Sequence, residues 1–427
     1  MGTLSLNLKK HRIKLFFGVV FLAFLIWFAN CLPDPLFSDP TCTVLEDANG
    51  NLLAGHIATD GQWRFPPINR IPEKFEYSIL YFEDEYFFYH PGVNPISIFR
   101  AAVQNISEQR IVSGGSTLTM QVIRLSRKGK PRTVFQKIIE IFMALKLELS
   151  MSKEEILGLY ATYAPFGGNV VGLESACWRY YNRSPEKLSW GEMATLAVLP
   201  NAPSLIYPGK NQERLLVKRN RLLDKLMREG VIDDITCELA KSEGLPGKPK
   251  SMPLLTPHLL TRLFNEGHAG ERIRTTIDQT LQTRANSIIS SYHKALSQNE
   301  VHNAALILID IETSKVLAYV GNTDCQHAES GQDIDIITAP RSTGSILKPF
   351  LYAAILKDGM LLPDALVADV PTKFGGFVPK NFAKGFDGAV PASEALARSL
   401  NIPAVRMHSK YGLPRFPDVL QELKLRS

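Results

Sequence analysis

The chain has 427 residues, a net charge of +6, and 45% hydrophobic and 21% charged residues. That length exceeds one compact domain, so two or more folded units are expected, and the apolar content excludes wholesale disorder. The charge is too small for this length to indicate a nucleic-acid-binding protein, and no nucleic-acid partner is expected. The five cysteines show no CxxC or metal-type spacing, which favours buried free thiols over a disulfide framework.

An uncharged run, residues 15–32, follows a basic segment at the N-terminus. The run is long enough to cross a hydrocarbon core as a helix, and no small-residue cleavage site follows it. Basic residues before it and acidic residues after it predict a cytoplasmic tail (1–14), a single transmembrane helix (15–32) and external domains. A cleaved signal peptide is the alternative. A lipidated Cys31 is disfavoured because Asn30 is a poor residue before it.

The next part of the chain alternates between weak and strong helical patterns. Residues 33–69 begin with a Pro-rich stretch typical of a stiff spacer. From 70 to 230 apolar residues recur at helical spacing, which predicts a mostly helical domain. Ser152 and Glu155 form a capping-box pattern that opens one of its helices. Residues 231–275 are weakly patterned and are predicted to be a linker.

The residue pattern changes from helical to partly β-rich in the last part, residues 276–427. Residues 304–322 contain two β-rich runs around a polar turn, which predicts a hairpin. A helical segment and further mixed structure follow. The expected architecture is therefore multidomain, with an N-terminal transmembrane helix, a mostly α domain and then an α/β domain.

The stretch EDEYFFYHPG, residues 83–92, combines two carboxylates with aromatic residues, a His and a Gly. Alone, it is as typical of a surface loop as of an active site. The hydroxyl-rich SGGSTLTMQ, residues 113–121, can bring backbone and hydroxyls close to a sugar or an anion. Lys137 and Glu140 lie at i, i+3 within an apolar stretch, where an unpaired Glu would be costly. Separated carboxylates beside a cation suit glycosyl chemistry.

These segments resemble, in order, the motifs of the peptidoglycan glycosyltransferases found in class A penicillin-binding proteins. The matching stretches are residues 83–92, GGSTLTMQ, KIIE, SKEEILGLY and KRNRLLDKL. Residues 164–176, APFGGNVVGLESA, are similar to the penicillin-binding protein 1C branch. The resemblance implies a lysozyme-like domain at the bacterial inner membrane. It would polymerise lipid II into β-1,4 glycan strands with inversion, on the outer, periplasmic side.

The resemblance also implies roles for individual residues. Glu83 would be the general base, and Glu140 with Lys137 would lie at the donor pyrophosphate. A divalent metal, Mg²⁺ or Mn²⁺, could bind there, and no tightly bound cofactor is expected. The residues expected to bind sugar or phosphate, or to line the site, are Asp84, His90, Ser116, Thr117, Gln121 and Arg124. A structural role is favoured for His90.

Three positions depart from the family pattern: Met120, Gln136 and Thr162. Gln136 stands where the family has an Arg, and Gln cannot copy the bidentate phosphate contact of a guanidinium. Reduced rather than abolished activity is expected, because both candidate catalytic carboxylates are present.

A second candidate site begins at Ser345 and Lys348, an S-x-x-K pattern, and SLN at 399–401 follows. One helical turn would place the Lys amine beside the Ser hydroxyl as a base. These segments resemble the acyl-serine transpeptidase domain of the same proteins, a serine beta-lactamase-like α/β fold. The resemblance implies that Ser345 is acylated by a D-Ala-D-Ala stem or by penicillin. Lys348 and Ser399 would pass protons, and Asn401 would hold the acyl amide.

The third motif of that fold, K-[ST]-G, is absent from residues 276–427. The transpeptidase part is therefore expected to be incomplete, with a hairpin lacking sheet partners, and labelled penicillin is expected not to mark Ser345. Expected partners are lipid II, nascent glycan strands, the membrane, other cell-wall synthesis proteins, or a chain that supplies the missing strands. Two alternatives stay open: a non-catalytic scaffold in a cell-wall complex, and a glycan-cleaving, lysozyme-like hydrolase.

Overall fold

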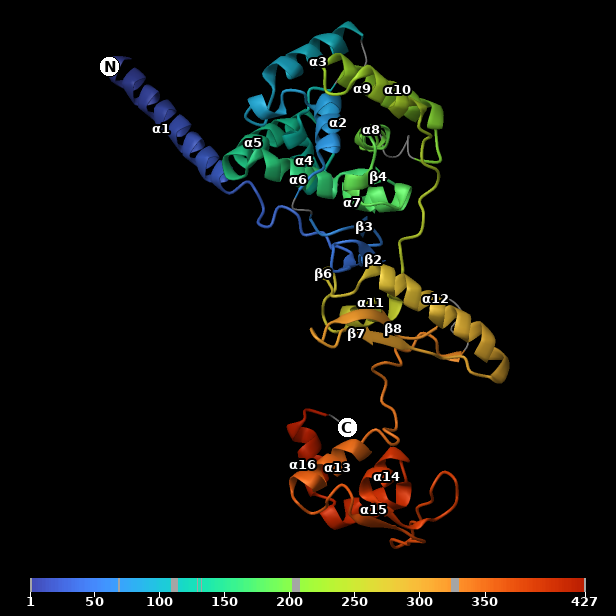
Figure 1. The fold of residues 1–427 in the computed structure, drawn as a ribbon. Coiled ribbons are helices and arrows are strands. Elements are labelled where there is room, and N and C mark those ends of the chain that lie inside the picture. The colour runs from blue at the N-terminus through green and yellow to red at the C-terminus, as the bar shows by residue number, and fades with distance from the viewer. Residues whose placement is uncertain are drawn as a thin grey trace. The chain divides into compact units, whose positions relative to one another are not determined.

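A computed structural model describes residues 2–67, 70–108, 114–128, 130–131, 133–201, 208–323 and 330–425 (Figure 1). The chain forms two compact units, Met1–Thr338 and Ala339–Ser427. The four cysteines within the described residues are free thiols, as predicted, and Cys325 lies outside those residues. Burial raises the pKa of the Cys42 thiol to about 11, which disfavours the reactive thiolate form at neutral pH.

Helix α1 (Gly2–Ala29) covers most of the predicted span and ends before residue 32. Its side chains are described from residue 14 onward, and many apolar ones are exposed, such as Leu15 at 71% and Phe21 at 61%. Phe24 packs edge-on against Phe142, with ring centroids 5.1 Å apart. Among the described residues, no helix is both long enough and apolar enough to cross a membrane.

The first unit contains a helical body, as predicted. Its elements in chain order are β3 (Trp63–Arg64), α2 (Glu73–Glu83), the 3-10 turn η1 (Phe87–Tyr89), α3 (Pro95–Ser107), α4 (Leu118–Ser126), α5 (Val134–Ser150), α6 (Lys153–Tyr163), β4 (Pro165–Gly167), β5 (Val170–Val171), α7 (Leu173–Ala176), the π-helical turn η2 (Cys177–Tyr181), η3 (Pro185–Lys187), α8 (Trp190–Val198), α9 (Gln212–Arg228) and α10 (Asp234–Ser242). The three short strands form one sheet in the order β3-β5-β4.

Helix α8 lies at the centre of this body. It is buried along almost its whole length and packs against α2, α9 and α10 (Figure 1). A helix that is apolar all round is stable only inside such a core. Capping boxes begin α8 at Ser189 and α6 at Ser152, and the second of these confirms the predicted Ser152–Glu155 box.

The predicted spacer and linker meet in one three-stranded sheet. Strand β1 (Thr43–Glu46) pairs antiparallel with β2 (Leu52–His56) and parallel with β6 (Arg272–Arg274). Regular helices, α10 and α11 (Pro257–Asn265), also lie within the predicted linker. Each has only nine residues, so its apolar pattern is too short to stand out from the sequence.

The predicted hairpin is confirmed: β7 (Leu306–Ile309) pairs antiparallel with β8 (Val316–Val320). Helix α12 (Gln279–Leu296), which is followed by the turn η4 (Ser297–Asn299), packs against β8. The Gln282 amide donates to the Tyr319 carbonyl (3.0 Å) and accepts from the Tyr319 N–H (2.7 Å). The buried Gln282 side chain thus pairs with backbone groups of Tyr319 that a neighbouring strand would otherwise pair with. The hairpin was expected to lack such a strand.

The second unit is a small α/β body. Its elements are α13 (Lys348–Lys357), β9 (Leu366–Asp369), β10 (Gly388–Pro391), α14 (Ala392–Ala397), α15 (Asn401–Tyr411) and α16 (Arg415–Glu422). Strands β9 and β10 pair antiparallel, and buried apolar residues of α13, α15 and α16 form the core beside them. Helix α13 begins at Lys348, so Ser345 lies in the preceding turn and not in the predicted helical turn.

Candidate active sites

Glu83 is the last residue of α2, and its carboxylate is held from two directions. One oxygen accepts from the Gln121 side-chain amide (2.8 Å) and the other from the Asn201 amide (3.2 Å). The Asn201 carbonyl in turn accepts from the Lys218 ammonium (2.8 Å). Burial lowers the pKa of Lys218, although the nearby Glu83 charge opposes that shift. Glu83 is therefore oriented by two neutral amides and keeps lone pairs free to accept a proton.

Asp84 and His90 are buried partners behind this carboxylate. Asp84 accepts from His90 Nε2 (3.0 Å) and from the Leu118 N–H at the start of α4 (2.9 Å). His90 Nδ1 accepts from the Gly92 N–H (3.1 Å). Both ring nitrogens are thus occupied inside the protein, and the pair ties residues 84–92 to α4. This arrangement agrees with the structural role favoured for His90.

The hydroxyl-rich segment connects three helices, and its first residue, Ser113, lies outside the described residues. Thr117 caps α4, because its hydroxyl accepts from the Met120 N–H (3.2 Å) and donates to the Gly92 carbonyl (2.6 Å). With its donor and one acceptor lone pair used, Thr117 positions α4 and keeps one lone pair for a ligand. Ser116 accepts from the Lys137 ammonium on α5 (2.5 Å).

Lys137 also lies 3.6 Å from the Glu140 carboxylate, which is the i, i+3 pair that the sequence predicts. The Glu140 side chain is 12% exposed and that of Lys137 is 37% exposed. The ammonium therefore joins the second carboxylate to the Ser116 loop, and a mostly buried Glu has the cation that it requires.

A pocket of about 140 Å³ brings several predicted residues together. Glu83, Asp84, Ser116 and Thr117 line it, whereas Gln121, Arg124, Lys137 and Glu140 do not. Two cations that the sequence analysis did not single out also line it: Arg100 and Lys225. Lys225 pairs with Glu85 at 2.6 Å. The pocket thus combines a candidate base and two further carboxylates with hydroxyls and two cations, of which Lys225 is paired with Glu85, which also lines the pocket.

The three departures from the family pattern have different surroundings. Met120 is fully buried in the hydrophobic core. Thr162 is 7% exposed, and its hydroxyl donates to the Gly158 carbonyl of its own helix (2.8 Å). Only Gln136 reaches a polar surface, where its carbonyl accepts from the Arg127 guanidinium (2.6 Å). Gln136, which stands where the family has an arginine, thus holds the guanidinium of Arg127 in place.

A second buried carboxylate network was missed in the sequence. Glu148, 8% exposed, accepts from the Thr119 hydroxyl (2.5 Å) and the Lys153 ammonium (2.8 Å). Lys153 also donates to the His90 carbonyl (2.7 Å) and lies 4.4 Å from the centre of the Phe87 ring. The only signal was a Glu within an apolar run, a pattern that Glu140 shares.

The second unit gathers three of its four predicted site residues around one ammonium. Lys348 Nζ donates to the Ser399 carbonyl (2.6 Å), the Ser399 hydroxyl (3.1 Å) and Asn401 Oδ1 (2.6 Å). Burial lowers the pKa of Lys348, which is the direction that a base requires. Ser399 adopts the left-handed region (φ 53°), which turns its hydroxyl and carbonyl towards Lys348. The exposed Ser345 hydroxyl has no hydrogen-bond partner among the described residues of this unit.

Lys348 and Asn401 also line a pocket of about 660 Å³, together with apolar residues of α13, α15 and α16. This volume lies within the range of small-molecule sites. The unit therefore presents an amine with a lowered pKa beside a hydroxyl and an amide at the edge of a large pocket.

A metal held by the protein would require several acidic, histidine or cysteine side chains that converge on one point. No group of three or more His, Cys, Asp or Glu among them is placed to hold a metal ion. Glu140 offers one carboxylate and already has Lys137 beside it. The described side chains by themselves therefore do not form a metal-binding set.

Two family models match the chain. Residues 50–227 match the model described as Transglycosylase, and residues 304–427 match the penicillin-binding protein transpeptidase domain. These are the two domain families that the resemblance to the class A penicillin-binding proteins predicts, and the chain is similar to proteins of that class over most of its length.

Within that class, the chain is 38% identical over 408 residues to penicillin-binding protein 1C of Escherichia coli (strain K12), covering 95% of this chain and 52% of that protein. It is 28% identical to penicillin-binding protein 1F of Bacillus subtilis (strain 168), covering 81% of this chain and 50% of that protein. The chain thus spans about half the length of these curated relatives. A 2.6 Å crystal structure of penicillin-binding protein 1A from Haemophilus influenzae aligns with 90% of this chain and 63% of that one, with a TM-score of 0.41 and 15% identity.

Proposed function

We propose that the first unit is a peptidoglycan glycosyltransferase that polymerises lipid II into β-1,4 glycan strands. The observation that carries this proposal is the Glu83 carboxylate, which two amides orient at a pocket lined by Ser116, Arg100 and Lys225. The match of residues 50–227 to the transglycosylase family supports it. A carboxylate beside cations suits proton abstraction next to an anionic leaving group.

In the proposed reaction, Glu83 accepts the proton of the acceptor 4-hydroxyl as its oxygen attacks the donor's anomeric carbon. The bond from that carbon to the pyrophosphate oxygen breaks, and the lipid pyrophosphate leaves with the electron pair. Attack opposite the leaving group inverts the anomeric centre. Lys137, held by Ser116 and Glu140, would lie at the leaving pyrophosphate, and Gln121 would keep Glu83 in position. A divalent cation, Mg²⁺ or Mn²⁺, brought by the substrate's phosphates, would have the Glu140 carboxylate as its protein ligand and would offset the charge of the leaving pyrophosphate.

The proposal places this unit at a bacterial inner membrane, with a single-pass anchor at 15–32, the tail 1–14 in the cytoplasm and the domains on the periplasmic side. Exposed apolar side chains support it: Leu15 and Phe21 on α1, Ile96 and Phe99 on α3, and Phe135 on α5. Apolar surface of this kind is unfavourable in water and suits a lipid interface. A tether in the same membrane as a lipid-borne substrate would raise the substrate's effective concentration.

For the second unit, the proposal is that it supplies residues for the acyl-transfer step of a complete transpeptidase domain. Ser345 would attack the D-Ala-D-Ala carbonyl, forming an ester and expelling the terminal D-Ala. The Lys348 amine, in its neutral form, would take the serine proton, and Ser399 would pass a proton to the leaving amine. The contacts of Lys348 with Ser399 and Asn401 support these roles.

The test is lipid II polymerisation by the detergent-solubilised chain, comparing wild type with Glu83→Gln. Removal of a general base typically lowers the rate by about 10²–10⁴-fold. A matched control, Glu73→Gln, removes a carboxylate from the first turn of the same helix and should keep near wild-type turnover. Products are resolved by chain length.

Equal turnover by Glu83→Gln and wild type would contradict the assigned base. No product from any of the folded variants would favour the scaffold alternative. Release of short fragments from lipid-free glycan would favour the hydrolase. Met120 and Thr162 lend no support to the scaffold, because neither side chain lines the Glu83 pocket.

A further inference from the structure

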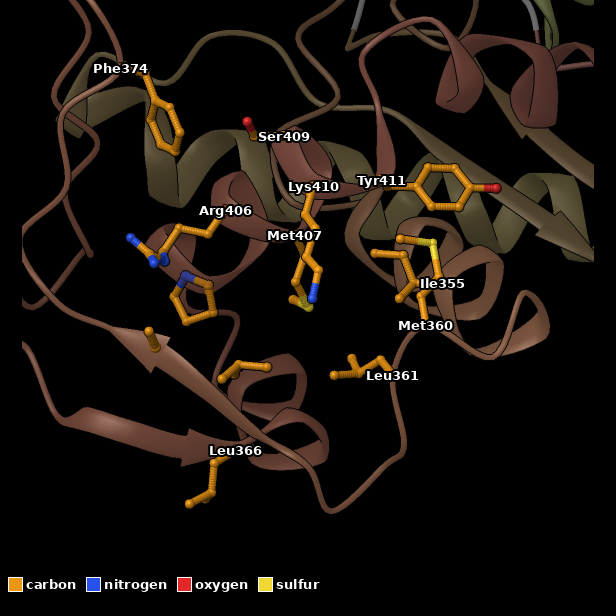
Figure 2. A pocket seen from close by; sticks show the side chains of 13 residues that line it. Ile355, Met360, Leu361, Leu366, Phe374, Arg406, Met407, Ser409, Lys410 and Tyr411 are labelled. Carbon is orange, nitrogen blue, oxygen red and sulfur yellow. The ribbon is translucent and has the colours of Figure 1, made fainter.

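The second unit has another cavity, of about 420 Å³, that shares no lining residue with the pocket at Lys348. Figure 2 shows its lining. Ile355, Met360 and Leu361 lie on one side, Arg406 lies on the other, and Lys410 lies between them (Figure 2). The volume is within the range typical of small-ligand sites.

The two pockets lie on opposite faces of helix α15. Residues 401, 404, 405 and 408 face the Lys348 pocket, whereas 403, 406, 407 and 410 face the second cavity. These two sets occupy opposite faces of an α-helix. The second cavity is therefore a separate feature that the proposed acyl transfer does not use.

Most side chains that line the cavity are apolar, and its polar groups come from Arg406, Ser409, Lys410 and the Tyr411 hydroxyl. Ile355 and Met407 are buried, whereas Leu366 on β9 is 69% exposed. Apolar side chains that border an open cavity remain hydrated until a ligand covers them. Such a lining fits the hydrocarbon part of a ligand.

Arg406 and Lys410 make the rim cationic, and none of the described residues that line the cavity is a carboxylate. Arg406 donates to the Thr372 hydroxyl (3.0 Å), and within the described residues of this unit neither Arg406 nor Lys410 forms an ion pair. The nearby Asp358 is already paired with Arg415 at 2.9 Å. Two cations at i, i+4 repel each other. The helix dipole favours a cation in the last turn of α15, where Lys410 lies, but not in the middle of the helix, where Arg406 lies.

We propose that this cavity binds a single-chain anionic amphiphile, with its carboxylate or phosphate at Arg406 and Lys410 and its hydrocarbon chain against Ile355, Leu361 and Met407. Charge complementarity selects the head group, since an anion relieves the repulsion between the two cations. A guanidinium and an ammonium together suit a small oxyanion. This site is independent of the proposed glycosyltransferase and acyl-transfer activities.

The test is photo-crosslinking of the full chain in a nonionic maltoside detergent with decanoic acid that carries a diazirine. Crosslinks should map to peptides that contain residues 355–368 and 403–411. The labelling yield of the double variant Arg406→Gln with Lys410→Gln should be roughly tenfold lower than that of wild type, because two charge-assisted contacts are removed. The matched control, Lys357→Gln with Lys384→Gln, also removes two positive charges from this unit but none from the cavity, and should label like wild type.

Three further measurements decide the class of ligand: labelling by an alcohol probe, competition by soluble amphiphiles and competition by lipid vesicles. The matching diazirine alcohol should label several-fold less than the acid, and unlabelled decanoate or decyl phosphate should compete. Equal labelling by acid and alcohol, or unchanged labelling of the Arg406/Lys410 variant, overturns the proposal. Competition by phosphatidylglycerol vesicles but not by decanoate would assign the site to a membrane lipid head group, and would also overturn it. Unchanged thermal unfolding of the double variant excludes misfolding as the cause of a loss.

Discussion

Met120 shows how a single side chain can lie within a motif and yet outside the site. It follows Thr119 and precedes Gln121, whose amide holds Glu83, but its own side chain is fully buried among apolar residues. Helical geometry explains the difference, because successive residues on α4 point about 100° apart. A departure from the family pattern at this position therefore changes the core.

Met120→Gln, which replaces this buried thioether with an amide, is expected to destabilise the first unit by about 2–3 kcal/mol, since a buried amide would lack partners. Turnover at a temperature where the protein is folded should not increase. Thermal unfolding combined with lipid II polymerisation measures both quantities.

The neighbouring substitution Gln121→Met provides the contrast. It removes the 2.8 Å contact to Glu83, so activity should fall with a smaller loss of stability. A gain in activity by Met120→Gln would instead place this side chain in the site.

At the scale of elements, the active-site loop is held by a close approach between the Gly92 turn and α5. Gly92 has φ +87°, a region that glycine tolerates and other residues rarely adopt. A Cβ there would lie 2.7 Å from Glu148 Cγ and 2.9 Å from the Ala144 carbonyl oxygen. The same Gly92 offers its N–H to His90 and its carbonyl to Thr117. This one turn thus connects the Glu83 loop with α4 and α5.

Gly92→Ala is expected to destabilise the first unit by about 2–4 kcal/mol, because it combines an unfavourable φ with a backbone clash. It should also lower glycosyltransferase activity by displacing Asp84 and His90. Thermal unfolding and the polymerisation assay measure the two effects. Gly247→Ala is the control, since a Cβ at Gly247 meets none of the described atoms within 4 Å and Gly247 does not line the Glu83 pocket. Equal unfolding temperatures for the two variants would show that the turn can relax.

Across the whole first unit, Arg272 joins three distant parts of the sequence. Its guanidinium pairs with Glu46 on β1 and with Glu174 on α7, and it donates to the Pro66 carbonyl (3.0 Å). Burial raises the pKa of Glu174 even with this partner present. The β2-β1-β6 sheet and the helical body are thereby connected by a mostly buried charge cluster.

Arg272→Gln is expected to destabilise the unit by about 3–5 kcal/mol, because two carboxylates would lose their cation. Adding Glu174→Gln should recover part of that loss, which a double-mutant cycle on thermal unfolding would measure. Additive effects of the two substitutions would contradict this coupling. Lys241→Gln is a suitable control, since Lys241 pairs with the partly exposed Asp224 and Glu238 at the surface.

Much of the local structure could be predicted from the sequence. The Ser152 capping box, the helices of residues 70–230 and the hairpin at 304–322 follow from patterns within a few turns of chain. The Lys137–Glu140 pair is likewise a matter of helical spacing. Ser345, in contrast, lies in a turn before α13, since Leu347 and not Ser345 is the N-cap residue.

The sequence by itself determined the order of motifs, the amphipathic helices and the residue types available for chemistry, because these depend on neighbours along the chain. Only the tertiary structure decided that Met120 is core, that Asn201 and Lys218 complete the surroundings of Glu83, and that the supposed spacer and linker pair as β1 and β6. Contacts between residues more than a hundred positions apart depend on packing of the whole unit, where burial must be offset by partners that no local pattern reveals.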